Sequence, residues 1–395
     1  MINQKMRALG ANRSVIRELF EYGSARKAEI GADNVYDFSL GNPSVEAPRE
    51  VNEGLVRLIN EESSVLLHGY TSAQGDASVR TAVADYINST HGEDVSADCI
   101  YMTVGAAAAL TCSLTAVVSS GEEVIVPTPY FPEYKVFIER CGGVIRTVPT
   151  RKADFKLDIP AIEAAINERT AAIIINSPNN PSGVVYDEEN ITALTDMLKR
   201  KEAELSHTIY LIADEPYREL VYGDAVVPYL TKYYDDTLVC YSFSKSLSIP
   251  GERIGYVLVC PRCRDFIQTY QAICGAGRSL GFVCAPSLLQ RLIPSCLGKV
   301  ADVGVYDKNR RLLVERLTEY GYEIIMPEGA FYLFIKSPSG DGGEMSERAK
   351  KYELLLVPSD DFGTPGYVRL SYCVTTEQIE RALPALRALI ESYKD

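Results

Sequence analysis

A chain of 395 residues can bury a full hydrophobic core, and one large domain with a smaller companion is the expected organisation. Its composition, with 46% hydrophobic and 24% charged residues, is ordinary for a globular protein. The net charge of -13 argues against a nucleic-acid or anionic-membrane partner, because an acidic surface would repel both.

The ten cysteines are scattered singly along the chain. The nearest pair, Cys260 and Cys263, directly follows an apolar run and has no second pair close by, so the sequence predicts reduced thiols and no metal site. No run of about eighteen apolar residues is present, and the N-terminus lacks the apolar segment of a signal peptide. We therefore expect a cytoplasmic protein with no membrane partner.

In chain order, the first predicted element is a helix within residues 13–30, where apolar side chains from Val15 to Phe20 recur at helical spacing. From about residue 75 to residue 275, short apolar runs alternate with helix-like stretches. The predicted strands span residues 99–104, 122–127, 144–149, 171–177, 209–214, 237–242 and 254–259. This alternation favours an α/β fold with a mostly parallel seven-stranded sheet and helices on both faces.

After about residue 285 the pattern changes to that of a smaller α+β domain. A long helical segment leads to a strand–turn–strand within residues 322–336, a charged helix, a strand at residues 367–372 and a last helix. We therefore expect three segments: residues 1–48 as the N-terminal part of the small domain, residues 49–285 as the large domain and residues 286–395 as the small C-terminal domain.

Polar and turn-forming residues follow the predicted strands of the large domain. In an open parallel sheet, ligands bind beyond the carboxyl ends of the strands. The stretches at those ends are Gly105 with an alanine-rich helix start, "TPYFPEY", "SPNNPSG", "DEPY" and "SFSK". The sequence therefore predicts a ligand cleft at this edge of the sheet.

Lys245 lies among three serines and eight positions ahead of Arg253. Most lysines are simply exposed, but an amine becomes a nucleophile toward an aldehyde when burial or nearby cations lower its pKa. Arg253 with Ser242 and Ser244 is typical of an anion site. A lysine beside a phosphate site suits pyridoxal phosphate, whose aldehyde joins the lysine while its phosphate is anchored close by.

Asp214 ends the apolar run 209–214, where an acid is costly unless a cation pairs with it. A protonated pyridine nitrogen would be such a cation, and a helix N-cap is the alternative role. Asn180 lies in the stretch "NSPNNPSG" and Tyr217 lies in the next loop. Turn formation alone would explain Asn180, but a stiff loop would also aim both side chains at a ring oxygen.

Three further positions suit the same site. The stretch from Gly105 to Leu110 lacks the lysine of a nucleotide P-loop, but a helix start presents free N–H groups to a phosphate. Tyr130 would stack on a planar cofactor in a chain that has no tryptophan. Arg369 lies inside an apolar strand, where it would either reach the surface or pair with a substrate carboxylate.

Together these residues resemble the class I/II, aspartate-aminotransferase-like, pyridoxal phosphate enzymes. The resemblance extends from "LGNPS" near residue 40 to "YVRLSY" near residue 370. It is carried by "NSPNNPSG", "ADEPY", "SFSKSLSIPGERIGY" and the terminal arginine, in this order and spacing.

The resemblance implies a role for each position. Lys245 would form the internal aldimine, and Asp214 would pair with the pyridine nitrogen. The other cofactor contacts would come from Ala106, Ala107, Tyr130, Asn180, Tyr217, Ser242, Ser244 and Arg253. The substrate carboxylate would be held by Arg369 with Gly41 and Asn180. The family is usually a homodimer, so Tyr70 would contact the phosphate in the neighbouring subunit.

The implied reaction transfers an amino group from an L-amino acid to a 2-oxo acid. A carbon–sulfur lyase that works by β-elimination on the same scaffold would use the same lysine, aspartate and arginine, so it remains the alternative. The sequence departs from aspartate-specific members at Ala107, where some relatives carry a lysine thought to read a distal carboxylate. Arg278 would bind the distal carboxylate in place of that lysine. Alternatively, it is a helix-terminal arginine that faces water or the dimer interface.

Overall fold

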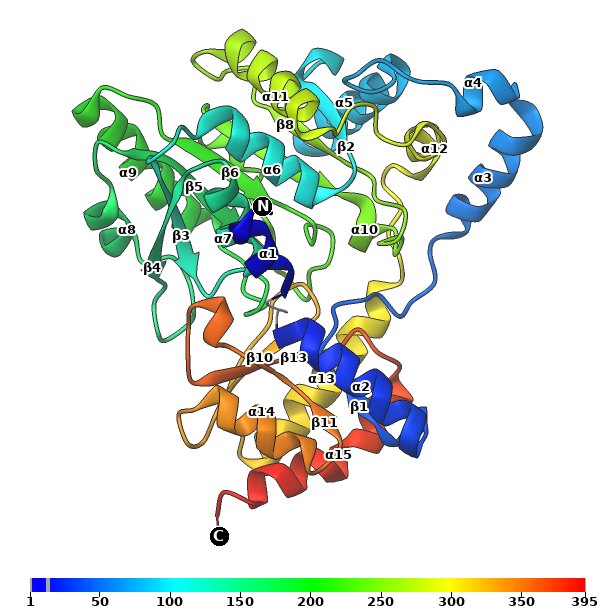
Figure 1. Ribbon diagram of the computed structural model, residues 1–395, viewed down its shortest axis with the longest axis vertical. Coiled ribbons are helices and arrows are strands. Elements are labelled where there is room, and N and C mark those ends of the chain that lie inside the picture. The colour runs from blue at the N-terminus through cyan, green and yellow to red at the C-terminus, as the bar shows by residue number, and fades with distance from the viewer. Residues whose placement is uncertain (1, 12–14, 395) are drawn as a thin grey trace.

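The computed structural model describes residues 2–11 and 15–394, which form two lobes (Figure 1). The upper, large lobe is built on a seven-stranded sheet with the order β2-β8-β7-β6-β5-β3-β4. Its strands are β2 (Ile100–Thr103), β3 (Glu123–Thr128), β4 (Val144–Pro149), β5 (Thr170–Asn176), β6 (Tyr210–Asp214), β7 (Thr237–Ser242) and β8 (Gly255–Val259). Neighbours run parallel except around β8, which is antiparallel to both β2 and β7. The predicted α/β fold with seven, mostly parallel strands is confirmed.

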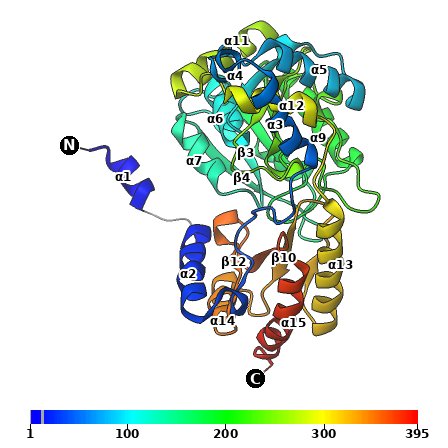
Figure 2. The same cartoon turned by 90° about the vertical axis from the view of Figure 1, so that its right-hand side faces the viewer.

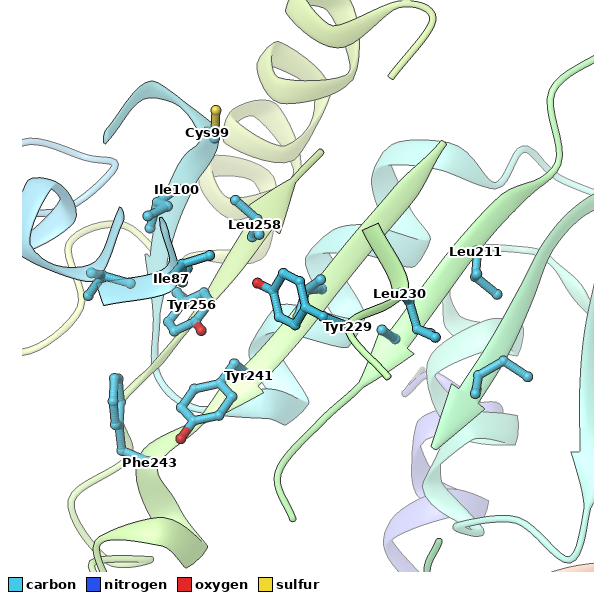
Figure 3. Packing of buried hydrophobic residues seen from close by; sticks show 14 of the residues in the cluster. Ile87, Cys99, Ile100, Leu211, Tyr229, Leu230, Tyr241, Phe243, Tyr256 and Leu258 are labelled. Carbon is cyan, nitrogen blue, oxygen red and sulfur yellow. The ribbon is translucent and has the colours of Figure 1, made fainter. Parts of the chain in front are cut away.

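Both faces of this sheet are buried, which explains why its strands read as unbroken apolar runs. Ile174 and Ile212 belong to one hydrophobic cluster, and their chain neighbours Ile173 and Leu211 belong to another. Successive side chains of a strand point to opposite faces, so the two clusters lie on either side of the sheet. Figure 3 shows part of the second cluster, including Leu211 and Tyr229.

The helices of the large lobe divide between the two faces. The first cluster includes residues of α6 (Ala106–Val117), α7 (Glu133–Arg140) and α11 (Phe266–Leu280). The second includes residues of α3 (Arg49–Glu61), α4 (Ser64–His68), α5 (Ala77–His91), α8 (Ile159–Ala165), α9 (Glu188–Leu205) and α12 (Ser287–Cys296). The short helix α10 (Phe243–Ser246) directly follows β7. Within residues 2–11 and 15–394, none of the helices combines the length and apolarity that a bilayer span requires.

Side-chain caps define the starts of several of these helices. Asp76 accepts hydrogen bonds from the N–H groups of Ser78 and Val79 at the start of α5, and Asp187 caps α9 in a similar way. Helix α6 is different, because its N-cap is Gly105, with a φ of 87° and no side chain to bond the free N–H groups. The start of α6 is therefore open to a ligand.

The small lobe is built from an N-terminal segment that includes α2 and from the C-terminal part of the chain (Figure 2). Its main sheet has the order β12-β13-β10-β9, and β1 pairs in parallel with β11. The strands are β1 (Tyr36–Asp37), β9 (Ile324–Ile325), β10 (Tyr332–Lys336), β11 (Leu354–Leu355), β12 (Val357–Pro358) and β13 (Tyr367–Ser371). The helices are α2 (Val15–Ile30), α13 (Val303–Tyr320), α14 (Gly342–Lys350) and α15 (Thr376–Glu391), and α1 (Gln4–Ala11) precedes them without burying any residue.

The long helical segment predicted after residue 285 is two helices, α12 and α13. Helix α12 packs against α3, α4 and α5 of the large lobe, whereas α13 packs against α15 of the small lobe. The predicted domain limit after residue 285 does not follow this packing. We propose that the large lobe continues through α12 and that the small lobe resumes at α13, with residues 1–48 as its N-terminal part.

The burial of residues in the central sheet predicts that two substitutions of apolar side chains by alanine will lower the free energy of unfolding by different amounts. Leu238 on β7 is fully buried, whereas the side chain of Val144 on the edge strand β4 is 48% exposed. We expect Leu238→Ala to lower the free energy of unfolding by about 2 to 5 kcal/mol, because it leaves a cavity in the core. Val144→Ala should cost less than about 1 kcal/mol. Urea unfolding followed by circular dichroism measures both, and equal losses would contradict this assignment of the core.

Candidate active site

A cavity of about 300 Å³ lies at the carboxyl ends of β5, β6 and β7, between the two lobes. Asn176, Asp214 and Ser242 are the last residues of these strands, and all three line the cavity. The small lobe contributes Tyr332 and Arg369 from the neighbouring strands β10 and β13. The predicted ligand cleft at this edge of the sheet is therefore present.

One end of the cavity is suited to an anion. A Cβ atom added to Gly105 would lie 2.6 Å from Nη2 of Arg253, so the guanidinium lies directly against the start of α6. Arg253 donates from Nη1 to the hydroxyl of Ser244 at 3.2 Å, and that hydroxyl lies 2.8 Å from the hydroxyl of Ser242. Ala106, in the first turn of α6, also lines the cavity. A guanidinium, two hydroxyls and the positive end of a helix together suit a phosphate.

Lys245, on α10, lies beside this anion site. Its ammonium donates to the carbonyl of Gly41 at 2.7 Å and lies 5.5 Å from the ring centre of Phe331. Burial lowers the pKa of Lys245 to about 8, and the positive charges of Arg253 and Arg369 act in the same direction. A substantial fraction of this amine is therefore neutral, and thus nucleophilic, near physiological pH.

Asp214 supplies a buried carboxylate with one oxygen unpartnered. Its Oδ2 accepts a hydrogen bond from the hydroxyl of Tyr134 and a longer one, at 3.4 Å, from Nδ2 of Asn176. Its Oδ1 is buried and has no hydrogen-bond partner. Burial raises the pKa of Asp214 to about 7, and the hydrogen bond from Tyr134 opposes this rise. No helix starts directly after Asp214, so the alternative of an N-cap does not hold, and the free oxygen suits a cation.

Arg369 is a buried cation without a carboxylate partner in the part of the chain that the structure describes. It donates to Oδ1 of Asn180 at 3.1 Å and to the carbonyl of Ser39 at 2.6 Å, while its Nε has no partner. Its guanidinium lies 4.6 Å from the ring centre of Tyr332. An unneutralised buried guanidinium is costly, so this position suits the carboxylate of a ligand.

Tyr217 and Gly41 complete the wall between the lobes. The hydroxyl of Tyr217 is hydrogen-bonded to that of Tyr332 at 2.9 Å. A Cβ atom at position 41 would lie 2.1 Å from the hydroxyl oxygen of Tyr332, so glycine is required for this close approach. Both residues line the cavity.

Tyr130, the predicted stacking residue, and its chain neighbour Phe131 differ in their position relative to the cavity. Phe131 lines the cavity, whereas Tyr130 does not. The N–H of Tyr130 donates to the carbonyl of Phe362, its ring is stacked on Tyr134 with centres 6.4 Å apart, and a Cβ on Gly363 would lie 2.8 Å from the ring. The small lobe therefore holds Tyr130 away from the cavity, and the side chain that reaches it is Phe131.

Two further predicted site residues lie outside the cavity of their own chain. Tyr70 follows α4 in a loop, and its side chain is 98% exposed. Arg278 lies exposed in the last turn of α11. Both would reach an active site only if a second chain lay against these surfaces.

Sequence reasoning missed Phe131, Tyr134, Asn176 and Tyr332. Asn176 is the last residue of the apolar run of β5, so its position at a strand end was a usable signal. Tyr134 and Phe131 lie in the quoted stretch "TPYFPEY", but nothing in that stretch indicates which ring faces the cavity. Tyr332 comes from the small lobe, where its neighbours form a continuous apolar run without any polar signal.

Comparison with known proteins shows the family of this chain. The family model for aminotransferase class I and II matches residues 33–386. The aspartate aminotransferase of Thermotoga maritima is 30% identical over 396 residues, which cover 95% of this chain and 97% of the relative.

Solved structures give the same result. An amino transferase from Eubacterium rectale superposes with a TM-score of 0.98, is 51% identical and covers 100% of both chains. The aspartate aminotransferase of Thermus thermophilus with maleate superposes with a TM-score of 0.87 at 26% identity, covering 98% of this chain and 100% of that one. The chain belongs to the class I and II aminotransferases, and it is a transaminase.

The surroundings of Lys245 predict its titration. Because burial lowers the pKa of this amine to about 8, it should be mostly neutral above that pH and mostly charged below it. Acetylation of the cofactor-free protein, measured by mass spectrometry between about pH 6 and pH 11, should show a midpoint near pH 8 at Lys245. The exposed amine of Lys199 serves as the comparison. If Lys245 reacted with the same midpoint as Lys199, its proposed environment would be wrong.

Proposed function

We propose that this transaminase is pyridoxal 5'-phosphate-dependent and moves an amino group from an L-amino acid to a 2-oxo acid. The observation that carries the proposal is the unpartnered Oδ1 of Asp214, buried in the same cavity as the amine of Lys245. A carboxylate oxygen placed in this way needs a cation, and the protonated ring nitrogen of the cofactor is one.

The residues present fit the cofactor at each of its functional groups. Lys245 would hold the aldehyde, and Asp214 would hold the ring nitrogen. The phosphate would lie at the start of α6 among Arg253, Ser242, Ser244 and the backbone of Ala106 and Ala107. Phe131 would stack on the ring in place of Tyr130, and Asn180 and Tyr217 would bind its phenolic oxygen. When bound, the cofactor supplies an electron sink for the pair of electrons released at the substrate α-carbon.

The chain's own residues would orient the substrate and move one proton. Arg369, with Gly41 and Asn180 beside it, would bind the α-carboxylate of the amino acid through its fork of donors. The amine of Lys245 would accept the proton released at the substrate α-carbon and would later donate it back. A pKa of about 8 suits both steps, because the amine is then neither a very weak base nor a very weak acid. The relatives reported above are aminotransferases, and none of them favours the carbon–sulfur lyase alternative.

We also propose a homodimer with shared active sites. Large apolar side chains are exposed on α3 and α4, and Tyr70 follows them in the chain. The exposed side chains are Val56, Ile59, Val65 and Leu66. A concentration of apolar surface of this kind is typical of a protein interface. The cytoplasmic location expected from the sequence stays a prediction.

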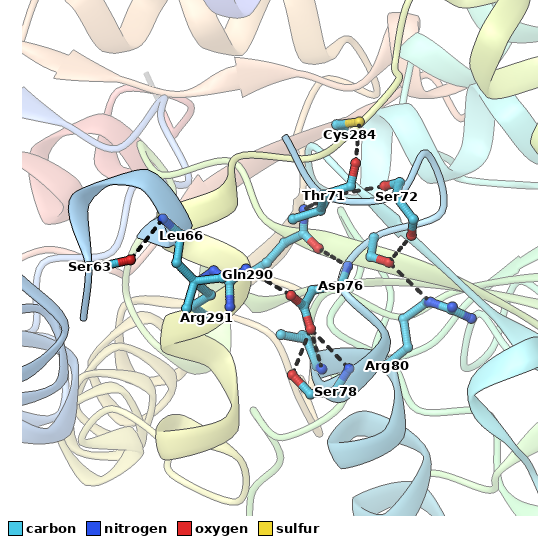
Figure 4. A network of polar contacts seen from close by, with 12 residues as sticks. Ser63, Leu66, Thr71, Ser72, Asp76, Ser78, Arg80, Cys284, Gln290 and Arg291 are labelled. Carbon is cyan, nitrogen blue, oxygen red and sulfur yellow. Dashed lines mark hydrogen bonds and ion pairs between the residues drawn. The ribbon is translucent and has the colours of Figure 1, made fainter. Parts of the chain in front are cut away.

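The loop that carries Tyr70 is held in place although Tyr70 itself is exposed (Figure 4). Gln290, buried on α12, donates to the hydroxyl of Thr71 and accepts from the N–H of Asp76. Cys284 donates to the carbonyl of Thr71. Such a loop would present Tyr70 to the phosphate of a partner's site with little loss of conformational entropy on assembly.

The Schiff-base assignment is tested by Lys245→Ala. We expect this variant to lose transamination and the yellow colour of the bound cofactor, because no other amine lines the cavity within the described residues. Its far-ultraviolet circular dichroism should match that of the wild type. Full activity with a set of amino donors and 2-oxo acids would remove Lys245 from the proposal.

The variant Arg278→Ala tests whether Arg278 binds a second carboxylate at the far end of the substrate. The cations that line the cavity in the described chain are Lys245, Arg253 and Arg369, and each already has a proposed role. A second carboxylate on the substrate would therefore need a cationic side chain from a partner subunit to bind it. Arg278 is our candidate for that side chain. We expect kcat/KM to fall by about tenfold or more for aspartate and glutamate, and little for alanine and leucine. Equal losses for the four donors would leave Arg278 with a structural role.

A further inference from the structure

The carboxylate of Asp214 is held from two sides, and both donors act on the same oxygen. Tyr134, in the first turn of α7, is fully buried and donates its hydroxyl proton to Oδ2. Asn176, at the end of β5, donates from Nδ2 to the backbone carbonyl of Asp214 at 3.0 Å and to its Oδ2 at 3.4 Å. Oδ1 receives no hydrogen bond.

Asn176 is itself fixed, because its Oδ1 accepts from the N–H of Asn180 at 2.8 Å. A carboxylate without such contacts can rotate and exchange its two oxygens. Here two donors from separate elements select one rotation, so that Oδ2 is satisfied by the protein and Oδ1 is left for a ligand.

We propose that Tyr134 is a positioning residue for the proposed transamination: with Asn176 it orients Asp214 so that Oδ1 faces the ring nitrogen of the cofactor. This inference rests on the proposed function. Tyr134 also contacts Phe131 edge-on, with ring centres 5.7 Å apart. One buried side chain therefore supports both the carboxylate of Asp214 and Phe131, the residue that would stack on the cofactor ring.

The pKa of Asp214 depends on the groups around it, and the hydrogen bond from Tyr134 acts to lower it. Four titratable groups face Asp214. Two are near it in the chain, Glu215 and Tyr217, and the others are Tyr134 on α7 and Cys240 on β7. Burial raises the pKa values of both tyrosines and of the thiol, so these three groups do not titrate together with Asp214. Glu215 is engaged by Arg218 at 2.5 Å.

The sign of the resulting pH dependence follows from linkage. The pKa of Asp214 is about 7 in the folded, cofactor-free chain, above its ordinary value of 3.8, so the folded state keeps a proton that the unfolded state has lost. The contribution of Asp214 to stability is therefore fully present below the ordinary pKa and is lost as the pH rises through about 7. Removing the Tyr134 donor raises the folded-state pKa further and extends this loss to higher pH.

The experiment compares cofactor-free wild type, Tyr134→Phe, Asp214→Asn and the double variant by urea unfolding across this pH range. The matched control is Tyr210→Phe. Tyr210 lies on the same strand as Asp214, and this change removes a hydroxyl that is hydrogen-bonded to Thr269. We expect Tyr134→Phe to move the pH-dependent loss of stability upward by about one unit. Tyr210→Phe should not move it, and Asp214→Asn should abolish it with or without Tyr134. A Tyr134→Phe curve parallel to that of the wild type would overturn the inference.

A second measurement uses the cofactor-loaded enzyme. Tyr134→Phe should lower kcat by about tenfold or more with KM changed by less than about twofold, because the substrate's own contacts are intact. An unchanged kcat would overturn the positioning role. If the purified protein bound no pyridoxal phosphate, the proposed function would fail, whereas the cofactor-free titration would still decide whether Tyr134 controls the ionisation of Asp214.

Discussion

The arrangement of the active site depends on a carboxylate buried at the end of a central strand. Asp214 follows the apolar run of β6, so the fold places its charge where water cannot solvate it. Tyr134 and Asn176 offset part of the cost by bonding one oxygen, and the other oxygen remains for a ligand. Because this cost is met only when a cation is bound, the same residue that lowers the stability of the cofactor-free chain would favour binding of the cofactor.

The second requirement is that both lobes reach the same edge of the sheet. Arg369, from the small lobe, bonds Asn180 of the large lobe, and Lys245 bonds the carbonyl of Gly41. These contacts cross between segments more than 180 positions apart in the chain, so the cavity exists only after the terminal segments have folded against the large lobe. The close approach of Tyr332 to Gly41 has the same origin. Positioning by both lobes also means that any movement between them would change the substrate site and the lysine together.

Much of the fold was predictable because its signals are local. Unbroken apolar runs of strand length predict buried strands, and all seven were found. A parallel sheet brings the ends of its strands to one edge, so Asp214 and Asn180 could be assigned to one cleft before any distance was known. The domain limit expected after residue 285 depends on helix α12, whose apolar face fits either core. We propose that α12 belongs to the large lobe, because it packs on α3.

The sequence by itself determined the class of fold, the position of the cleft and the residues whose chemistry is distinctive, such as Lys245 and Arg369. These depend on residue type and on chain order, which folding does not alter. The tertiary structure decided that Phe131 rather than Tyr130 reaches the cavity, that Tyr134 bonds Asp214, and which carboxylate oxygen is left unpartnered. The physical reason is that side-chain direction and burial are set by contacts between segments far apart in the chain, and a local pattern carries no information about them.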